Sequence, residues 1–315
     1  MSILKKALAA AVVAGLVSTV GVVPANAAPK NQARSVAQPD WLEANLDNPK
    51  VRIIEVSTEP GLYERGHIKN AIKFVWHTDL VDTVNRDIIN AKNFSKLVQK
   101  AGISDDTTVV LYGDKNNWFA AWGAWIFNLY GAKDVRILDG GRVKWEKDGR
   151  ALTTAVTTKA KGNFTATRLD KTLRATLLQD IIQVAKKRVK VDLIDIRSAD
   201  EYSGKIFAPA GFQELAVRAG HIPGAINIPW GLNVNADGTF KTVAELKKVY
   251  ADKGVDGTQP IITYCRIGER SSLTWFVLSE ILGYDVKNYD GSWTEYGNTV
   301  GVPISNPSGT IWGNS

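Results

Sequence analysis

The sequence predicts an α/β fold made of two tandem copies of one domain, each with a mainly parallel central sheet flanked by helices. Two observations support this prediction. Three sequence blocks recur in the same order at nearly constant spacing, and short apolar strands alternate with helical segments. Such alternation over short connections is typical of parallel sheets, because a helix is needed to carry the chain back to the same end of the sheet.

The repeat is clearest between residues 66–76 and residues 220–230, where six of the eleven positions are identical at an offset of 154. The other aligned blocks are 108–113 with 260–265, at an offset of 152, and 135–141 with 286–292, at an offset of 151. Ordered blocks at nearly constant spacing indicate a tandem duplication of a domain of roughly 120–130 residues, a common domain size.

The elements of the second copy each have their own signal. Residues 242–251 predict a helix, since Thr242 and Glu245 have the spacing of a capping box at its start. Residues 272–282 have helical spacing that ends at Gly283, and Ser271 and Ser272 are expected to cap this helix. The short apolar runs that predict buried strands are 191–195, 225–228 and 260–264.

The N-terminal segment predicts a signal peptide. Lys5 and Lys6 precede an uncharged apolar run over 7–23, and Ala25-Asn26-Ala27 then supplies the small residues that a signal peptidase reads. The run is short for a membrane span, so we expect cleavage after Ala27 rather than a retained anchor. The protein is then exported, either secreted or held in the cell envelope, with no membrane association after cleavage.

The remaining boundaries follow from the repeat and from composition. A polar stretch rich in Lys and Thr lies between the two copies and predicts a linker region. The expected parts are a signal peptide over 1–27, a first domain over 28–157, a linker over 158–172 and a second domain over 173–315.

The composition excludes several classes of protein. The chain has 315 residues, of which 44% are hydrophobic and 23% charged, so it is neither disordered nor collagen-like. One Cys cannot form an intrachain disulfide, and three His with one Cys leave little for a zinc site, so we expect no metal and no cofactor. The net charge of +7 is spread along the chain without basic blocks, which gives no reason to expect a nucleic-acid partner.

The single Cys265 stands where a predicted strand feeds a predicted helix, in the sequence Cys-Arg-Ile-Gly-Glu-Arg-Ser-Ser. Ligands of parallel sheets bind at the carboxyl ends of the strands, and amide groups at a helix start favour an anion there. A thiolate is such an anion. A buried structural Cys is the alternative, but the charged residues Arg266, Glu269 and Arg270 crowd the position, which favours a reactive thiol.

The spacing within this segment favours sulfur chemistry over phosphoryl chemistry. Phosphatases with a C-x5-R loop need an arginine six positions after the cysteine, where this chain has Ser271. Its arginine, Arg270, comes one residue earlier. A loop smaller by one residue suits a single sulfur atom better than a tetrahedral phosphate.

The chain resembles the tandem-domain rhodaneses, which are thiosulfate sulfurtransferases, over almost its whole mature length. The motifs that carry the resemblance are 195–197, 220–225, 265–271 and 289–293, and the loop from Cys265 to Ser271 is similar to that of actinobacterial-type members. The resemblance implies that only the second copy is catalytic. In agreement, Gly113 stands in the first copy at the position of Cys265.

The resemblance also implies a double-displacement reaction. The Cys265 thiolate takes the outer sulfur of thiosulfate, sulfite leaves, and the Cys265 persulfide passes its sulfur to cyanide or to a thiol. The backbone of the loop is expected to bind the substrate and stabilise the persulfide, and Arg266 and Arg270 are candidates for holding the sulfonate group. The expected substrate-binding residues are Arg266, Ile267, Gly268, Glu269, Arg270 and Ser271.

Two departures from the better-studied vertebrate enzymes stand out. Those enzymes carry basic residues at the positions of Ile267 and Glu201, and Glu269 adds a negative charge at the anion site. We expect Arg270 to substitute, with Glu269 turned outward or paired to Arg266. The alternatives are a 3-mercaptopyruvate sulfurtransferase, disfavoured because an arginine follows the cysteine directly, and a non-catalytic persulfide carrier or binding module.

Four further residues are candidates for supporting the site. Asp195 and Arg197 follow a predicted strand, where Asp195 orients the loop or serves as a structural cap. Trp118 and Phe119 follow the corresponding loop of the first copy and face the cleft between domains if the arrangement of the family holds. His67 and His221 occupy equivalent repeat positions, so we expect a shared structural role, and His77 has no partner visible in the sequence.

Overall fold

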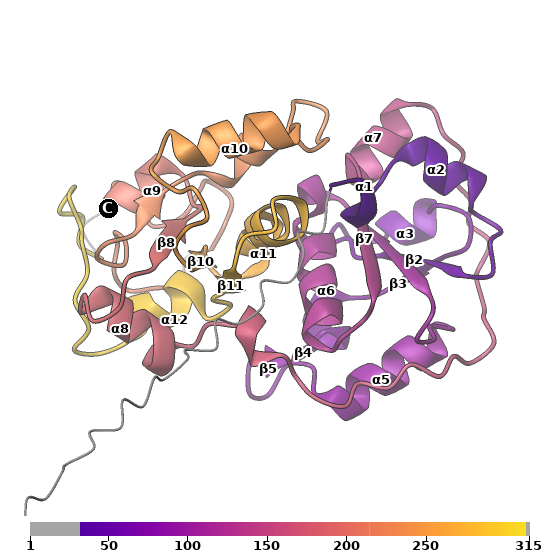
Figure 1. The fold of residues 1–315 in the computed structure, drawn as a ribbon, viewed down its shortest axis with the longest axis horizontal. Helices are drawn as coiled ribbons and strands as arrows, with labels where there is room; N and C mark the ends of the chain where they lie inside the picture. The colour runs from indigo at the N-terminus through magenta and orange to yellow at the C-terminus, as the bar shows by residue number, and fades with distance from the viewer. Residues whose placement is uncertain (1–31, 214, 313–315) are drawn as a thin grey trace, which may run out of the picture.

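The computed structural model describes residues 32–213 and 215–312, and it shows two α/β domains side by side, each built on a parallel sheet (Figure 1). The predicted signal peptide over 1–27 lies outside the described residues. Within the described ranges, no helix is long and apolar enough to cross a membrane. The predicted fold class is confirmed.

The first domain has a five-stranded sheet in the order β1-β7-β6-β2-β3, in which every neighbouring pair is parallel. Its strands are β1 (Val36–Ala37), β2 (Val51–Glu55), β3 (Ala71–Lys73), β6 (Thr108–Tyr112) and β7 (Asp134–Leu138). A small antiparallel hairpin, β4 (Val81–Asp82) with β5 (Asp87–Ile88), projects from this domain. Its helices are α1 (Gln32–Ser35), α2 (Pro39–Ala44), α3 (Leu62–Arg65), α4 (Trp76–Asp79), α5 (Ala91–Lys100), α6 (Trp118–Leu129) and α7 (Gly141–Lys147).

The second domain has a four-stranded parallel sheet in the order β11-β10-β8-β9. Its strands are β8 (Asp192–Asp195), β9 (Ile226–Asn227), β10 (Ile261–Tyr264) and β11 (Val286–Asn288), so the three predicted strands lie within one or two residues of their expected places. Its helices are α8 (Ile182–Ala185), α9 (Ala199–Ser203), α10 (Val243–Ala251), α11 (Glu269–Phe276) and α12 (Ser292–Asn298).

The helix starts of the second domain show one prediction confirmed and one wrong. The capping box at α10 is present, since the Glu245 N–H donates to the Thr242 hydroxyl and the Thr242 N–H donates to the Glu245 carboxylate. Ser271 and Ser272 do not cap α11. This helix begins earlier, after Gly268, and both hydroxyls donate back to the Gly268 carbonyl at 2.9 Å. It also ends at Phe276, followed by a wide π-type turn over Val277–Ile281.

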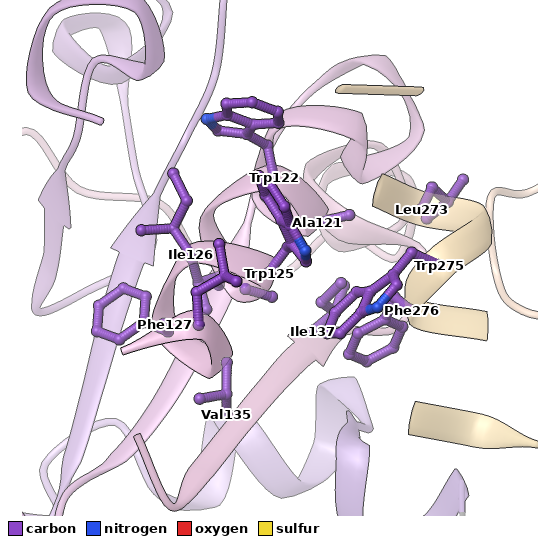
Figure 2. Close-up of a cluster of buried hydrophobic side chains, with 14 of the residues drawn as sticks. Ala121, Trp122, Trp125, Ile126, Phe127, Val135, Ile137, Leu273, Trp275 and Phe276 are labelled. Carbon is purple, nitrogen blue, oxygen red and sulfur yellow. The ribbon is translucent and has the colours of Figure 1, made fainter. Parts of the chain in front are cut away.

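Helices α6 and α11 pack against each other and join the two domains through one hydrophobic core (Figure 2). The core is rich in tryptophan. Trp125 of α6 and Trp275 of α11 are both fully buried, and the ring of Trp122 lies 5.1 Å from that of Trp125. Because α6 and α11 each follow the central strand of their own sheet, their packing sets the two corresponding loops at the domain boundary.

The segment predicted as a linker runs along the first domain. The Gly162 N–H donates to the Gln99 carbonyl at 2.8 Å, and the Phe164 N–H donates to the Ile103 carbonyl at 3.2 Å. Phe164 is buried in the common core. The segment is therefore fixed to the end of α5, and its precise bounds stay a prediction.

Candidate active site

Cys265 directly follows β10 and lies almost entirely inside the protein, with 1% of its surface exposed. Its sulfur accepts the Gly268 N–H at 3.1 Å. Its own N–H donates to the Ser292 hydroxyl at 3.1 Å, and the same hydroxyl lies 4.0 Å from the sulfur. The backbone therefore curls around the thiol, as expected for a loop that stabilises a thiolate.

Gly268 is the residue that allows the loop to close. Its φ of +109° is a conformation that side chains rarely adopt, and a Cβ there would lie 2.9 Å from both the Asp290 Cα and the Trp122 ring. Trp122 belongs to α6 of the first domain. The loop that holds Cys265 is thus shaped by its own glycine and supported by the other domain.

The loop presents amide groups that the chain itself does not use. Among the residues that the structure describes, no acceptor is found for the N–H groups of Arg266, Ile267, Arg270 and Ser271. Together with the positive end of α11, these groups form a site suited to an anion attached to Cys265. The six residues that the sequence assigned to substrate binding are therefore brought together around the thiol.

Arg270 is held by a buried carboxylate from the second domain's own α9. Its guanidinium donates to Glu201 at 3.0 and 3.3 Å, and Glu201 is only 1% exposed. Burial alone would raise the pKa of Glu201, but Arg270 and Arg197 hold it below its usual value. Burial works against the charge of Arg270, while Cys265 and Glu201 raise its pKa overall, so Arg270 stays charged beside the thiol.

The expectation for Glu269 is wrong. It is neither turned outward nor paired to Arg266: only 4% of it is exposed, and Arg266 instead donates to the Gln213 carbonyl at 2.7 Å and lies over the Phe212 ring. Burial raises the pKa of Glu269 to about 7, because desolvation outweighs the nearby guanidinium groups of Arg86, Arg266 and Arg270. The sequence missed this because it could not show which way the helix start faces.

A cavity of about 400 Å³ opens at the loop between the two domains. Trp118 and Phe119 line it, as predicted, and the Trp118 ring meets Trp230 edge to face at 4.7 Å and lies beneath Arg270. The full lining is Trp118, Phe119, Ser198, Glu201, Pro209, Phe212, Pro229, Trp230, Gly231, Arg266, Ile267, Glu269 and Arg270. We call this the main cavity; its walls are mostly aromatic and apolar.

A second cavity of about 370 Å³ also borders this loop. It shares Ile267 and Glu269 with the main cavity, and the β4–β5 hairpin of the first domain forms much of its rim. Its full lining is Trp76, His77, Val81, Asp82, Thr83, Arg86, Asp87, Trp122, Leu215, Ile267, Glu269 and Asp290. We call this the hairpin cavity. Glu269 thus faces both openings.

Asp195 and Arg197 lie beneath the loop rather than in either cavity. Arg197 pairs with Asp195 at 2.6 Å, and the Tyr264 hydroxyl donates to the same carboxylate at 2.7 Å. This network joins the ends of β8 and β10, and so it orients the strand that leads to Cys265. His67 and His221 stack on Tyr63 and Tyr202 and bond to backbone carbonyls, which agrees with a structural role.

Three residues at the site were not singled out as candidates from the sequence. The sequence marks Glu201 only as a departure from the vertebrate enzymes, Trp230 only as part of a repeat block and Ser292 only as part of a motif. A usable signal was present for Ser292, since a hydroxyl residue follows Asp-Gly where the first copy has Gly141. Within 32–213 and 215–312, no cluster of three or more His, Cys, Asp or Glu side chains could hold a metal ion.

Comparison with known proteins agrees with this architecture. A 51% identical "Sulfur carrier protein TtuD" of Thermus thermophilus covers 84% of this chain and 94% of its own length. A 55% identical "Putative thiosulfate sulfurtransferase" of Mycobacterium tuberculosis covers 84% and 95%.

Two solved structures are also similar. The 3-mercaptopyruvate sulfotransferase SseA of Escherichia coli has a TM-score of 0.70 and 26% identity, covering 82% of this chain and 98% of its own. An anaerobic ergothioneine biosynthesis enzyme of Chlorobium limicola has a TM-score of 0.74 and 24% identity, covering 87% and 71%, which shows the fold alone. The family model for the rhodanese-like domain matches residues 38–148 and again residues 178–299, so this chain belongs to the rhodanese family and carries two copies of its domain.

Proposed function

We propose that this protein moves the sulfane sulfur of thiosulfate to a thiol or to cyanide through a persulfide on Cys265. The observation that carries the proposal is the loop itself: the Cys265 sulfur accepts the Gly268 N–H at 3.1 Å, and four further amide groups of the same loop have no acceptor within the described residues. A sulfur atom bound to Cys265 would meet those amides, which stabilise its negative charge.

In the first step the Cys265 thiolate attacks the outer sulfur of thiosulfate. A bond forms between the two sulfur atoms, and the outer sulfur's bond to the sulfonate sulfur breaks. Sulfite leaves with that electron pair. Arg270, held charged between Glu201 and Cys265, is the side chain best placed to offset the negative charge of the donor.

In the second step an acceptor thiolate or cyanide attacks the outer sulfur of the persulfide. The sulfur–sulfur bond to Cys265 breaks, and the electron pair returns to the Cys265 thiolate. The two steps make a ping-pong cycle, in which donor and acceptor use the same loop in turn. The buried position of Cys265 protects the persulfide from water and from wasteful reactions.

The choice of thiosulfate as donor is supported by the name of the Mycobacterium tuberculosis relative, and the choice of sulfur transfer by the names of that relative, of TtuD and of SseA. The test is mass spectrometry of the intact protein after treatment with thiosulfate and, separately, with 3-mercaptopyruvate. We expect one added sulfur from thiosulfate and stoichiometric release of sulfite. Cys265→Ser should gain no sulfur from either donor. Loading from 3-mercaptopyruvate alone would replace thiosulfate as the donor.

A persulfide carrier is a second candidate, because both loop arginines are already engaged by the protein. Arg270 binds Glu201, and Arg266 binds the Gln213 carbonyl, which leaves fewer side-chain charges for a dianion. A 51% identical relative is also named as a sulfur carrier. Repeated sulfite release from thiosulfate with cyanide present supports the enzyme; one equivalent and no more supports the carrier.

We also propose that the protein is exported and loses residues 1–27. The charged start, the apolar run and the Ala25-Asn26-Ala27 site support this proposal. The intact mass of the mature protein, isolated from the medium or the cell envelope of the producing cell, tests it. A chain that begins at Ala28 is expected, and an uncleaved chain in the cell interior would contradict it.

A further inference from the structure

Glu269 is an unusual residue for a loop that binds anions. It lies next to Gly268, whose N–H reaches the Cys265 sulfur, and it precedes Arg270. It is buried, and its side chain lines both the main cavity and the hairpin cavity. Among the described residues, no side chain donates a hydrogen bond to its carboxyl group. A carboxyl group held dry and open to both cavities can give or take a proton.

The charged groups that face Glu269 come from several elements. The hairpin contributes Asp82, Arg86 and Asp87, and α4 contributes His77. The loop contributes Arg266 and Arg270, with the Cys265 thiol, while α9 contributes Glu201.

Several of these groups are already engaged by other residues. Asp290 lies after β11 and is held by Arg174 at 2.8 Å. Arg270 and Arg266 are likewise engaged, by Glu201 and the Gln213 carbonyl. No neighbour therefore fixes Glu269 in one charge state.

The charge of Glu269 changes what the main cavity accepts. With Glu269 ionised, the two carboxylates and two guanidinium groups of that cavity cancel, and a dianion gains nothing. With Glu269 protonated, those side chains carry a net charge of +1, which offsets the negative charge of the Cys265 thiolate. A dianionic donor therefore favours the protonated form, whereas an acceptor thiol, which must lose its proton to attack, favours the ionised form.

We propose that Glu269 carries one proton per cycle from the acceptor thiol to the departing sulfite. This inference rests on the proposed function and identifies a neutral, protonated thiol as the acceptor class that this site serves. Donor and acceptor bind in turn at the same loop, so a single carboxyl group on that loop can meet both.

The proton balance closes over the two steps. In the first, the Cys265 thiolate takes the outer sulfur of thiosulfate, and sulfite leaves with the electron pair and with the proton of Glu269, as hydrogen sulfite. In the second, ionised Glu269 removes the proton of the thiol, and the resulting thiolate takes the outer sulfur of the persulfide. Cys265 is again a thiolate and Glu269 is again protonated. The sum is thiol plus thiosulfate giving a persulfide anion and hydrogen sulfite, with no oxidant or reductant.

The two half-reactions should therefore depend on pH in opposite directions. Sulfur loading from thiosulfate should slow as pH rises through about 7, where Glu269 loses its proton. Discharge of the persulfide to a thiol should accelerate over the same range. We call these two pH dependences the limbs. Both follow the ionisation of Glu269, so they should share one midpoint.

The test is single-turnover kinetics of each half-reaction with the full-length protein and its Glu269→Gln variant, between pH 5.5 and 8.5. Loading is followed by sulfite release, and discharge is followed with 2-mercaptoethanol and with thionitrobenzoate, a thiol already ionised at neutral pH. We expect Glu269→Gln to lose both pH limbs. Discharge to 2-mercaptoethanol should fall about 100-fold, the usual size of general-base assistance, while discharge to thionitrobenzoate changes less than about 3-fold.

Two further variants separate this role from a structural one. Glu269→Asp should restore both limbs, since it keeps an ionisable group. Asp82→Asn removes another carboxyl group of the hairpin cavity and should leave both limbs in place. If Glu269→Gln keeps the limbs, or slows both thiols equally, the inference is overturned. If the wild-type protein releases no sulfite from thiosulfate, the proposed donor fails instead, and discharge of a persulfide loaded from another donor still decides the base role of Glu269.

Discussion

The two domains end their central strands in different loops, and only the second of these loops holds a thiol. In the first domain the Asn117 side chain fills the loop: its oxygen accepts the Gly113 N–H, and its nitrogen donates to the Leu138 carbonyl. In the second domain that interior is occupied by the Cys265 sulfur, which accepts the Gly268 N–H. The first loop uses the Gly113 and Asp114 amides on side chains of its own domain, since the Asp114 N–H donates to the Ser57 hydroxyl, whereas the second loop keeps four amides for a ligand.

The two domains also differ in the residues around each loop. A Cβ on Gly113 would lie 2.3 Å from the Val56 carbonyl oxygen, and one on Gly141 would lie 2.4 Å from the Asn117 side chain. Ser292 occupies the position of Gly141 in the second domain, at a φ of +53° that is costly for a serine. The hydroxyl that receives the Cys265 N–H is thus kept in spite of backbone strain.

Beneath the loops the two domains agree. Glu55 accepts from Tyr112 and pairs with Arg142 at 3.0 Å, as Asp195 accepts from Tyr264 and pairs with Arg197. A network that is present in both domains supports the sheet rather than the reaction. The second copy therefore differs from the first in what its loop leaves open, not in how its sheet is built.

The largest expected effect comes from moving the cysteine between the two loops. Cys265→Ser should abolish sulfur loading. Adding Gly113→Cys to this variant should not restore sulfur loading, because a Cβ at position 113 would lie 2.3 Å from the Val56 carbonyl oxygen. Mass spectrometry after thiosulfate measures both. A sulfur atom gained by the double variant in its first loop would break the comparison.

Removing one arginine from each domain should separate catalysis from folding. Arg270→Ala and Arg142→Ala each leave a buried carboxylate unpaired, and each should cost about 3–5 kcal/mol of unfolding free energy. Only Arg270→Ala should also slow sulfur loading, by about 100-fold, when rates are compared per folded molecule. Denaturant titration and stopped-flow sulfite release give the two readouts. Combining Arg270→Met with Glu201→Gln should recover stability without recovering the rate.

The buried acids of the two loops should respond to neutralisation with opposite sign. Folding raises the pKa of Glu269 from 4.5 to about 7, so this residue lowers stability once the pH exceeds its unfolded value, and the cost is complete above pH 7. Glu269→Gln should therefore stabilise the protein by about 3 kcal/mol at pH 8.5 and by almost nothing at pH 4. Asp114 accepts the N–H groups of Thr58 and Glu59, so Asp114→Asn should destabilise the protein. Thermal unfolding at both pH values checks this.

The smallest expected effect on activity comes from the residues of the first domain that line the main cavity. Trp118→Ala removes the ring that packs against Trp230 and lies beneath Arg270, and it should raise the KM of the donor by about 3–10-fold with little change in kcat. Trp41→Ala changes a tryptophan of the same domain away from both cavities and serves as the control. Equal effects of the two substitutions on KM would remove the first domain from the site.

The sequence was enough to predict what local patterns and repetition encode. The capping box of Thr242, the strands that the three repeat blocks contain and the place of Cys265 at a strand end all depend on neighbouring residues. The placement of Trp118 on the cavity wall followed from the repeat and the resemblance to the family.

What could not be predicted depends on contacts between distant segments. Arg270 and Glu201 are 69 positions apart in the sequence, and the sequence alone marks Glu201 only as the absence of a basic residue. The inward orientation of Glu269 depends on where α11 starts, and that start is set by Gly268 fitting between Trp122 and Asp290 rather than by a capping serine. A residue's own pattern carries no record of such partners.

The contact of the Trp122 ring with Gly268 makes the second domain depend on the first, which has no cysteine. The second domain cannot be separated from it without exposing Trp275 and Phe276 to water and removing the floor of its own loop. The first copy can therefore lack a thiol, but it cannot lack α6. Among natural variants of this chain, we expect position 113 to be occupied only by residues that fit beside the Val56 carbonyl oxygen. Position 122 should stay a large flat aromatic, as though it belonged to the catalytic domain.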